Sequence, residues 1–475
     1  MSMLVRLLQR TGLQVLPTLL STLMLGCSQA GRIVGPSETE LPLPQSFKLH
    51  FNHRASGRYR DPLNRGWRNG DNLEKRLIQQ IDSAREEVLL AIQELTLPKI
   101  AESLIRAQGR GVKVQVVLEN NYSSPWSEQH PSDLTVHNRR RLQQLQLLAD
   151  SNRDGRLTAE ERLAGDAIAL LKRSGIPMID DTEDGSRGSG LMHHKFLVVD
   201  RALVITGSAN FTSSGMHGDA GVSRSRGNVN HQLSIQSAEL AELFRAEFER
   251  MWGDGPGGQR NSRFGRGKNN RGVQSVEANG VQIKVLFSPH SDQLPGHGLD
   301  LIGEQLTAAQ RNIDMALFVF SDQSLTNILA ERLKAGVGIR LLADPGFAGR
   351  SFSEVLDLLG LELPDRFCKL EAGNNPLKTP LQSVGTPKLA NGDKLHHKFA
   401  VIDNKTVITG SFNWSPAAAH TNDETLLVIH SPKLAAHFTR EMNRMWRSAE
   451  LGITPRIQRK LERQHAKCGS GEKRG

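Results

Sequence analysis

Aromatic residues and cysteines are scarce in this chain of 475 residues. Phenylalanine, tryptophan and tyrosine together make up 5% of it, so no aromatic platform for stacking nucleic-acid bases is indicated. Of the three cysteines, Cys27 lies in an N-terminal segment, which leaves Cys368 and Cys468 for the folded part. An oxidising compartment would permit a disulfide between these two, and two free thiols are the equal alternative.

Long apolar runs are also missing, apart from one stretch at residues 13–25. Arg6 and Arg10 precede it, and a basic start before a short apolar segment indicates a signal peptide rather than a membrane-spanning helix. The sequence ending at Gly26 and Cys27 resembles a bacterial lipoprotein box. That resemblance implies a signal peptide over residues 1–27, lipidation of Cys27, export and a membrane anchor. Plain secretion and an uncleaved anchor are the alternatives.

The net charge of +10 concentrates in two segments. One is a linker at residues 253–275, rich in glycine and arginine, and the other is a basic tail at residues 453–475. Such charge favours anionic lipid surfaces and nucleic acid alike. We interpret the linker as a solvated loop between domains, with nucleic-acid binding as the alternative. Residues 28–46, rich in proline, glycine and polar residues, are interpreted as a tether.

Against these absences stands one motif, His-x-Lys-x4-Asp-x6-Gly-Ser-x-Asn, which occurs twice with identical spacing. The first copy comprises His193, Lys195, Asp200, Gly207, Ser208 and Asn210, and the second comprises His396, Lys398, Asp403, Gly410, Ser411 and Asn413. Apolar runs at residues 196–199 and 399–402, each followed by a second short run, predict two β-hairpins. Histidine and lysine, two positions apart, then share one face of the first strand.

These residue types suit cleavage of a phosphodiester. Of two histidines, one can attack phosphorus and the other can protonate the leaving oxygen. Lys195 and Lys398 would neutralise the non-bridging oxygens, to which the motif serines and asparagines would donate hydrogen bonds. The scheme requires no metal. Asp200 and Asp403 are interpreted as supporting rather than reacting groups.

With this duplicated motif, the chain resembles the phospholipase D superfamily from about residue 47 to residue 452. The resemblance implies an α/β fold of two similar lobes, each a mixed β-sheet flanked by helices, with one active site between them. It also implies a covalent phosphohistidine intermediate. His193 and His396 would be the nucleophile and the general acid/base; the resemblance favours His193 as nucleophile, whereas spacing alone does not assign the roles.

The repeat extends beyond the motifs. Residues 81–88 match 306–313, residues 110–114 match 335–339, and residues 244–252 match 438–446. Alternating strands and helices over this length indicate duplicated α/β domains rather than a solenoid. We therefore expect lobes at residues 47–252 and 276–452. Because both motifs lie in one chain, we expect a catalytic monomer.

The first lobe carries an insert, at about residues 138–172, that contains an EF-hand-like loop. Asp150, Asn152, Asp154 and Thr158 would offer side-chain oxygens to Ca²⁺, Arg156 its carbonyl group, and Glu161 both carboxylate oxygens. Amphipathic helices are expected on both sides of the loop. The alternative is an acidic surface turn followed by a capped helix, since Thr158 to Glu161 also fits a capping box. Calcium would be structural or regulatory here.

The two repeats differ after their motifs. Glu424 follows the second motif, where members of the resembled family often keep a carboxylate that orients a catalytic histidine, and Asn230 stands in the matching place of the first repeat. The first site would then use an amide or His231. A surface role for Glu424 at the start of a strand is the alternative.

The sequence thus predicts an exported, lipid-anchored phosphodiesterase of the phospholipase D type. Its expected reaction is hydrolysis of glycerophospholipids in membranes to phosphatidic acid and headgroup alcohol, with transphosphatidylation where an alcohol replaces water. A nuclease of the same superfamily is the first alternative. A calcium-dependent membrane-binding protein with a vestigial site is the second, and two intact motifs argue against it.

Overall fold

A computed structural model describes residues 40–63, 65–186, 190–269 and 271–469. The predicted signal peptide at 1–27, with Cys27, lies outside the described residues, as does the tether up to residue 39. Within the described part, none of the helices has the length and apolar character needed to span a membrane.

The first seven main strands form one mixed sheet. In spatial order they are β1 (Phe47–Phe51), β9 (His231–Gln236), β8 (Leu203–Gly207), β7 (Lys195–Val199), β4 (Glu87–Ile92), β5 (Lys113–Leu118) and β6 (Met178–Asp180). Strands β4, β5 and β6 run parallel, and the β1 to β4 side is antiparallel. Every residue of β4 and β7 is buried, as expected for apolar strands covered on both faces.

The second sheet repeats this order and adds a strand at each edge. Its strands are β10 (Gln274–Ala278), β11 (Val281–Ser288), β17 (Glu424–His430), β16 (Thr406–Gly410), β15 (Lys398–Ile402), β12 (Asn312–Leu317), β13 (Gly338–Ala343), β14 (Val384–Thr386) and β18 (Glu450–Leu451). Apart from these sheets, β2 (Arg58–Arg60) pairs with β3 (Trp67–Asn69). The structure therefore has the predicted α/β class with two similar mixed sheets.

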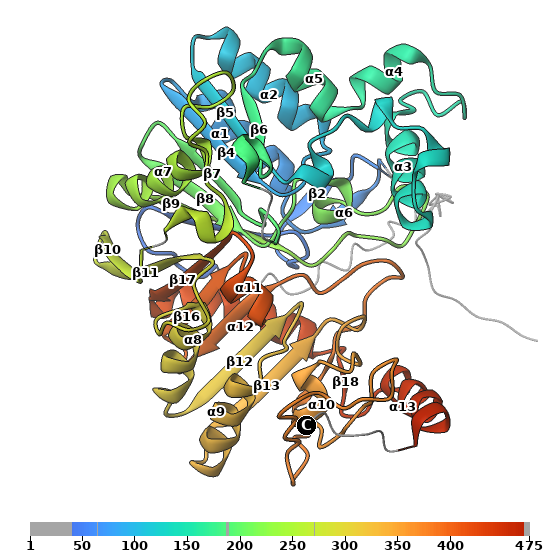
Figure 1. Cartoon of the computed structure of the whole chain (residues 1–475), viewed down its shortest axis with the longest axis vertical. Helices are drawn as coiled ribbons and strands as arrows, with labels where there is room; N and C mark the ends of the chain where they lie inside the picture. Colours follow the sequence, from blue (N-terminus) through green and yellow to red (C-terminus); the bar gives the residue numbers. More distant parts are fainter. Residues whose placement is uncertain (1–39, 64, 187–189, 270, 470–475) are drawn as a thin grey trace, which may run out of the picture. The chain divides into compact units, whose positions relative to one another are not determined.

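Helices cover the sheets and fill the space between them (Figure 1). The first repeat contributes α1 (Leu73–Ser83), α2 (Pro98–Gly109), α3 (Val136–Ala149), α4 (Ala159–Ala164), α5 (Ala167–Ser174), α6 (Ser213–Met216) and α7 (Ala238–Trp252). The second contributes α8 (Gly298–Thr307), α9 (Gln323–Lys334), α10 (Glu354–Leu358), α11 (Pro416–His420), α12 (Pro432–Trp446) and α13 (Pro455–Cys468).

Helices α7 and α12 belong to a hydrophobic core that both sheets share. Phe244 and Phe248 of α7, four residues apart on one face, are fully buried, as are Phe438 and Met442 of α12. Burying each such side chain contributes about 1.5–3 kcal/mol. Two further cores lie on the outer faces, one on each lobe. The shared core holds the two lobes together and so brings their motifs to one boundary.

Most described residues of the glycine- and arginine-rich linker are exposed, as predicted for a solvated loop, but three of its side chains are packed inside the protein. Ser262, Phe264 and Lys268 are 0%, 3% and 4% exposed. Lys268 contacts Glu247 of α7 and lies 2.7 Å from Asp423 of the second lobe. The prediction of a solvated loop is therefore wrong for these three side chains, because the glycine-rich composition of the whole segment does not indicate which single residues pack.

The basic tail forms helix α13, which is docked on the second lobe. Ile457 and Leu461 are buried against the outer core. Its last residue, Cys468, forms a disulfide with Cys368, with the Cα atoms 5.2 Å apart. Of the two alternatives that the sequence left open, a disulfide or two free thiols, the structure has the disulfide.

We predict that replacing Cys368 and Cys468 together by serine lowers the free energy of unfolding by about 2–4 kcal/mol, because the disulfide restricts the unfolded chain. Denaturant unfolding of the oxidised protein measures the difference. A reductant should reproduce the loss in the wild type and leave the double variant unchanged. A wild-type stability that does not respond to reductant would contradict the prediction.

Candidate active site

Each motif forms the predicted strand, tight turn and strand. Hairpin β7–β8 turns at Asp200 and Arg201, with φ of 50° and 53°, and β15–β16 turns at Asp403 and Asn404, with φ of 53° and 57°. Two consecutive residues of positive φ make the type of turn whose twist matches paired strands, and asparagine and aspartate adopt that conformation at low cost. The two hairpins thus have the same local form.

The motif aspartates tie their hairpins to the same lobe. Asp200 accepts backbone N–H groups at 2.7–3.1 Å, from Arg85, Glu86 and Glu87. Asp403 accepts the matching three at 2.7–3.0 Å, from Gln310, Arg311 and Asn312. Both carboxylates lie at the turns, at the opposite end of the strands from the histidines. Their contacts are structural.

The backbone beside each motif histidine pairs with the opposite lobe. His193 N–H donates to the carbonyl of Asp423 at 2.9 Å, and Asp423 N–H donates to that of Leu191 at 2.9 Å. His396 N–H donates to the carbonyl of Val229 at 3.1 Å. These two exchanges fix both histidines at the lobe boundary.

The orienting groups are also exchanged between the lobes. Glu424, from the second lobe, places its carboxylate oxygens 2.7 and 2.8 Å from Nδ1 of His193. Asn230, from the first lobe, places Oδ1 3.0 Å from Nδ1 of His396. An acceptor at Nδ1 holds the proton there and leaves Nε2 available for reaction. His231 instead contacts His397 and Thr409.

The motif serines support these orienting groups and do not point at a substrate. Ser411 donates to Glu424 at 2.6 Å, and Ser208 donates to Asn230 at 2.7 Å. A serine hydroxyl has one proton to donate, so the predicted bond from each serine to a phosphate oxygen is not available in this arrangement. The spacing correctly predicted that the serines lie at the strand ends. It did not predict that their hydrogen-bond partners are Glu424 and Asn230.

The two lysines have different neighbours. Lys195 donates to the His193 carbonyl at 2.6 Å and to Gln93 Oε1 at 3.1 Å, and Asn210 also donates to Gln93. Lys398 donates to the His396 carbonyl at 2.8 Å, and its ammonium lies 5.0 Å from the ring centre of Phe318. An ammonium has three protons, so Lys195 keeps one and Lys398 keeps two for a ligand.

Sequence reasoning missed Gln93 and Phe318. They take equivalent places, one residue after β4 and one after β12. The repeat between residues 81–88 and 306–313 continues to them and would have revealed the pair. The ring of Phe318 also lies 4.6 Å from that of His396. The site is therefore polar beside one lysine and aromatic beside the other.

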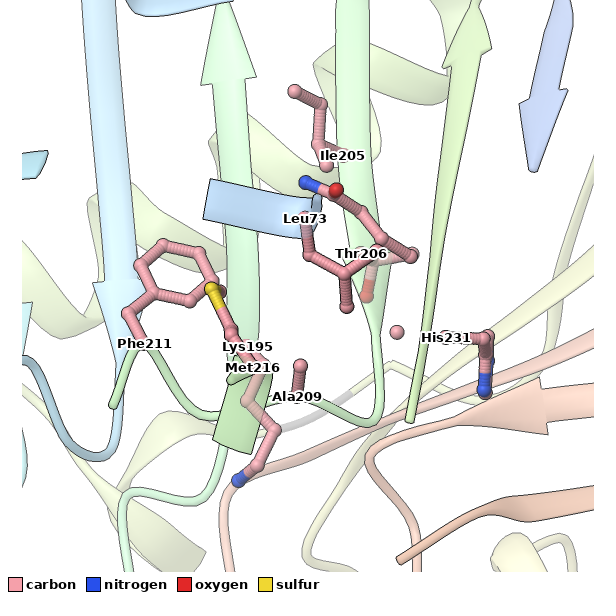
Figure 2. Close-up of a pocket in the computed structure, with 10 residues that line it drawn as sticks. Leu73, Lys195, Ile205, Thr206, Ala209, Phe211, Met216 and His231 are labelled. Carbon is pink, nitrogen blue, oxygen red and sulfur yellow. The ribbon is translucent and has the colours of Figure 1, made fainter. Parts of the chain in front are cut away.

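A small cavity lies behind Lys195, at the ends of β7 and β8 (Figure 2). The ammonium points away from its apolar lining residues Ile205, Phe211 and Met216. The volume of about 10 Å³ has room for roughly one water molecule and not for a substrate. These apolar surroundings disfavour the protonated, charged form of Lys195.

Burial shifts the proton affinities of the central groups. It holds the pKa of His193 and of His396 well below the ordinary value, and the nearby lysines add to the effect. Burial lowers the pKa of Lys195 to about 7 and raises that of Glu424 to about 7. The cluster therefore disfavours its own positive charge until an anion enters, which suits a phosphate ligand.

A second layer of histidine–glutamate contacts lies behind the motif histidines. His194 contacts Glu247 at 3.2 Å, and His397 contacts Glu441 at 3.3 Å. Burial opposes ionisation of Glu247, but Lys268 outweighs it and holds the pKa of that carboxyl at about 2. These contacts anchor the strands that carry the reactive groups.

The EF-hand-like loop connects α3 to α4, and its acidic groups accept hydrogen bonds from the chain itself. Thr158 and Glu161 form the reciprocal capping box of α4, and Asp150 accepts from two backbone N–H groups. Helix α4 ends after six residues, and α5 begins separately after Asp166. Across the ranges that the structure describes, no three or more His, Cys, Asp or Glu side chains assemble into a metal site. The loop thus takes the capped-turn geometry that was the alternative.

A family model described as "Cardiolipin synthase, PLD-like domain" matches residues 77–252 and 302–446, one motif in each range. The mitochondrial cardiolipin hydrolase of Chlamydomonas reinhardtii is 27% identical over 143 residues, which are 30% of this chain and 55% of that protein. A phospholipase D of Rickettsia bellii is 29% identical over 154 residues, 32% of this chain and 64% of that protein. Each match thus spans less than two thirds of the relative.

One solved structure covers both lobes. The phosphatidylserine synthase of Haemophilus influenzae superposes with a TM-score of 0.54 at 12% identity, over 90% of this chain and 94% of that one. At this identity the likeness concerns the fold alone, which is a pair of sheets arranged as described above.

For turnover of soluble bis(p-nitrophenyl) phosphate, we predict that kcat/KM falls as pH rises through about 7. The free Lys195 ammonium loses its proton there and no longer neutralises the phosphate. A bound anionic substrate stabilises the Lys195 ammonium and raises its pKa. The alkaline fall of kcat should therefore lie at higher pH than that of kcat/KM. Rate profiles from pH 5 to 10 would measure both, and coincident alkaline limbs would contradict the prediction.

Proposed function

The chain belongs to the PLD-like, cardiolipin synthase-type family of the phospholipase D superfamily, and from that premise we propose that it hydrolyses glycerophospholipids to phosphatidic acid and headgroup alcohol. The observation that carries the proposal is the pair of buried imidazoles, each oriented at Nδ1 from the opposite lobe. Two ammonium groups lie beside them. Such a set can attack phosphorus, protonate a leaving group and neutralise charge.

In the proposed first step, Nε2 of one histidine bonds to phosphorus while the bond to the headgroup oxygen breaks. The second histidine, protonated, gives that oxygen its proton. In the next step it takes a proton from water, whose oxygen bonds to phosphorus as the phosphohistidine bond breaks. Phosphatidic acid leaves, and an alcohol in place of water would give transphosphatidylation.

We assign His193 as the nucleophile and His396 as the general acid/base. The imidazole that carries the phosphoryl group becomes positively charged. The carboxylate of Glu424 stabilises that charge better than the neutral amide of Asn230 does. Lys195 and Lys398 would neutralise the non-bridging oxygens. Asn210 and Asn413 would donate to the same oxygens through Nδ2, and Nδ2 of Asn210 has a second proton besides the one that it donates to Gln93.

Access to the site supports a lipid headgroup as substrate. His193 and His396 are 6% and 8% exposed, so a phosphodiester must reach a recessed position. The phosphodiester of a lipid, on a freely rotating glycerol, can reach this position. The backbone of a rigid nucleic-acid duplex cannot enter it. The matched relatives are named for cardiolipin hydrolysis and phospholipase D activity. We keep nucleic acid as an outcome of the test.

The proposal includes location. An exported chain anchored through Cys27 would sit on the surface that holds its substrate. The disulfide between Cys368 and Cys468 supports an oxidising compartment. The complete constellation within one chain supports a catalytic monomer, and the intact histidines and lysines argue against a vestigial site.

The deciding experiment compares liposomes of phosphatidylcholine, phosphatidylglycerol or cardiolipin with single-stranded and duplex DNA, using the full chain. Headgroup release is expected. His193→Ala and His396→Ala should each lower it by about 10³-fold or more, because each removes one reacting group. His465→Ala, an exposed histidine on α13, is the matched control. Cleavage of DNA without headgroup release would overturn the lipid substrate.

The same variants test the assignment of roles. With an activated p-nitrophenyl ester, which needs no proton donor, His396→Ala should still form a phosphoenzyme adduct that is stable in alkali and labile in acid, as a phosphohistidine is, and His193→Ala should form none. An adduct in His193→Ala would reverse the assignment.

Calcium binding at residues 150–161 is a separate part of the proposal. Its support is the spacing of an all-oxygen donor set, Asp150, Asn152, Asp154, Thr158 and Glu161 with the Arg156 carbonyl, of the kind that Ca²⁺ takes. Ca²⁺ there would hold the insert in one conformation. Its place would be structural or regulatory, with no part in the chemistry.

We predict that millimolar Ca²⁺ raises the Tm of the wild type and not that of Glu161→Gln. Glutamine keeps the capping box but removes the bidentate charge. Without Ca²⁺ the two proteins should therefore unfold alike, which separates the two roles of Glu161. Calorimetry that detects neither heat of binding nor a Tm shift in the wild type would end this part of the proposal.

A further inference from the structure

A cavity of about 290 Å³ lies between helix α13 and the loop that follows β13. Its cations are Arg350 from the loop and, from the helix, Arg456, Arg459, Lys460 and Arg463. The glycine backbone at Gly346 completes one wall. None of these residues belongs to the two motifs.

The helix presents these cations because of its spacing. Ile457 and Leu461, four residues apart, are buried against the second lobe. Arg456, Arg459, Lys460 and Arg463 lie at intervals of three, four and seven, so they share the adjacent face. Thr454 caps the start of the helix, and the disulfide at Cys468 secures its end. The cations are therefore held on a docked helix and not on a mobile tail.

The positive charge of the cavity is not balanced by the protein. Among the described residues, no carboxylate forms an ion pair with Arg350, Lys460 or the three helix arginines. Burial, followed by the charges of Arg350 and Arg456, lowers the pKa of Lys460. A cluster of like charges in a concave site is stabilised by an anion.

Exposed aromatic side chains lie beside the cavity. A neighbouring hollow of about 490 Å³ shares Arg350 and Lys460. Its lining includes Phe352 and Phe367, two further cations, Arg366 and Lys369, and two carboxylates, Asp365 and Glu371. These phenylalanines are 41% and 66% exposed. Aromatic rings beside cations are the pairing that places a protein at the boundary between lipid headgroups and acyl chains.

We propose that this basic cavity and its two phenylalanines form a binding site for anionic phospholipid headgroups, separate from the catalytic histidines. A bilayer fits better than nucleic acid, because the cations converge on one cavity instead of following a strand. Moreover, Arg366 lies 4.6 Å over the ring of Phe367 and occupies one of its faces.

The site is connected to the catalytic centre. Its loop carries Phe347, whose ring lies 4.6 Å from that of Phe318, and Phe318 contacts His396. In Figure 1, α13 lies beside β18 and α10 at the edge of the second sheet. Binding here would hold the lobe that carries the second motif against an anionic membrane. The inference concerns surface binding, so it can hold or fail independently of the proposed reaction.

The test measures the affinity of the full chain for neutral phosphatidylcholine vesicles and for vesicles with 20% phosphatidylglycerol. The N-terminal segment is the same in every variant, so comparing this ratio between a variant and the wild type isolates the effect of the substitutions. In Arg459→Ala/Arg463→Ala this ratio should fall by about twenty-five-fold at low salt, roughly five-fold for each of the two cations removed. Phe352→Ala/Phe367→Ala should weaken binding to both kinds of vesicle.

Arg139→Ala/Arg140→Ala is the matched control, because it removes two exposed arginines from α3 and should leave the ratio unchanged. Turnover of soluble bis(p-nitrophenyl) phosphate should be the same in all these variants, which separates this site from the reaction. An equal loss in the control pair would overturn the proposal. So would release of the vesicles by millimolar inorganic phosphate at constant ionic strength, or a loss of DNA affinity in place of vesicle affinity.

Discussion

The active site depends on one constraint: a buried imidazole needs a hydrogen-bond acceptor at Nδ1. Neither lobe supplies that acceptor to its own histidine. Glu424 serves His193 and Asn230 serves His396, each across the boundary, and each is supported by a serine from its own lobe. The shared core of α7 and α12 makes this exchange possible, because it sets the distance between the sheets. A single lobe therefore contains the reactive residues but not a functional site.

The two lobes are nearly symmetric in fold, but the two halves of the site that they form are unequal. One histidine faces a carboxylate and the other an amide, and one lysine lies beside Gln93 while the other lies over Phe318. The proposed two-step reaction would use this inequality, because in it one imidazole bonds to phosphorus while its partner moves protons. The duplication provides two copies of the groups, and a few substitutions around them distinguish their environments.

Two basic segments show where composition misleads. The composition of the linker predicted a solvated loop, yet Lys268 is enclosed by carboxylates. The C-terminal tail, predicted only to be basic, forms α13, which is docked on the second lobe. Average polarity describes most of each segment correctly. Single apolar residues decide whether each segment packs against the protein. They are Phe264 in the linker and Ile457 with Leu461 in the C-terminal tail. The cations of α13 are thereby held in place and form a cavity.

The sequence by itself determined the α/β class, the two hairpins and which histidines and lysines come together at the candidate site. These follow from local spacing, because strand periodicity and turn residues specify which side chains share a face. Only the tertiary structure decided that Glu424 orients the histidine 231 residues away, that the serines support the orienting groups, and that Cys368 pairs with Cys468. Such pairings depend on which surfaces meet when the two lobes pack, and periodicity carries no information about what lies opposite a given face.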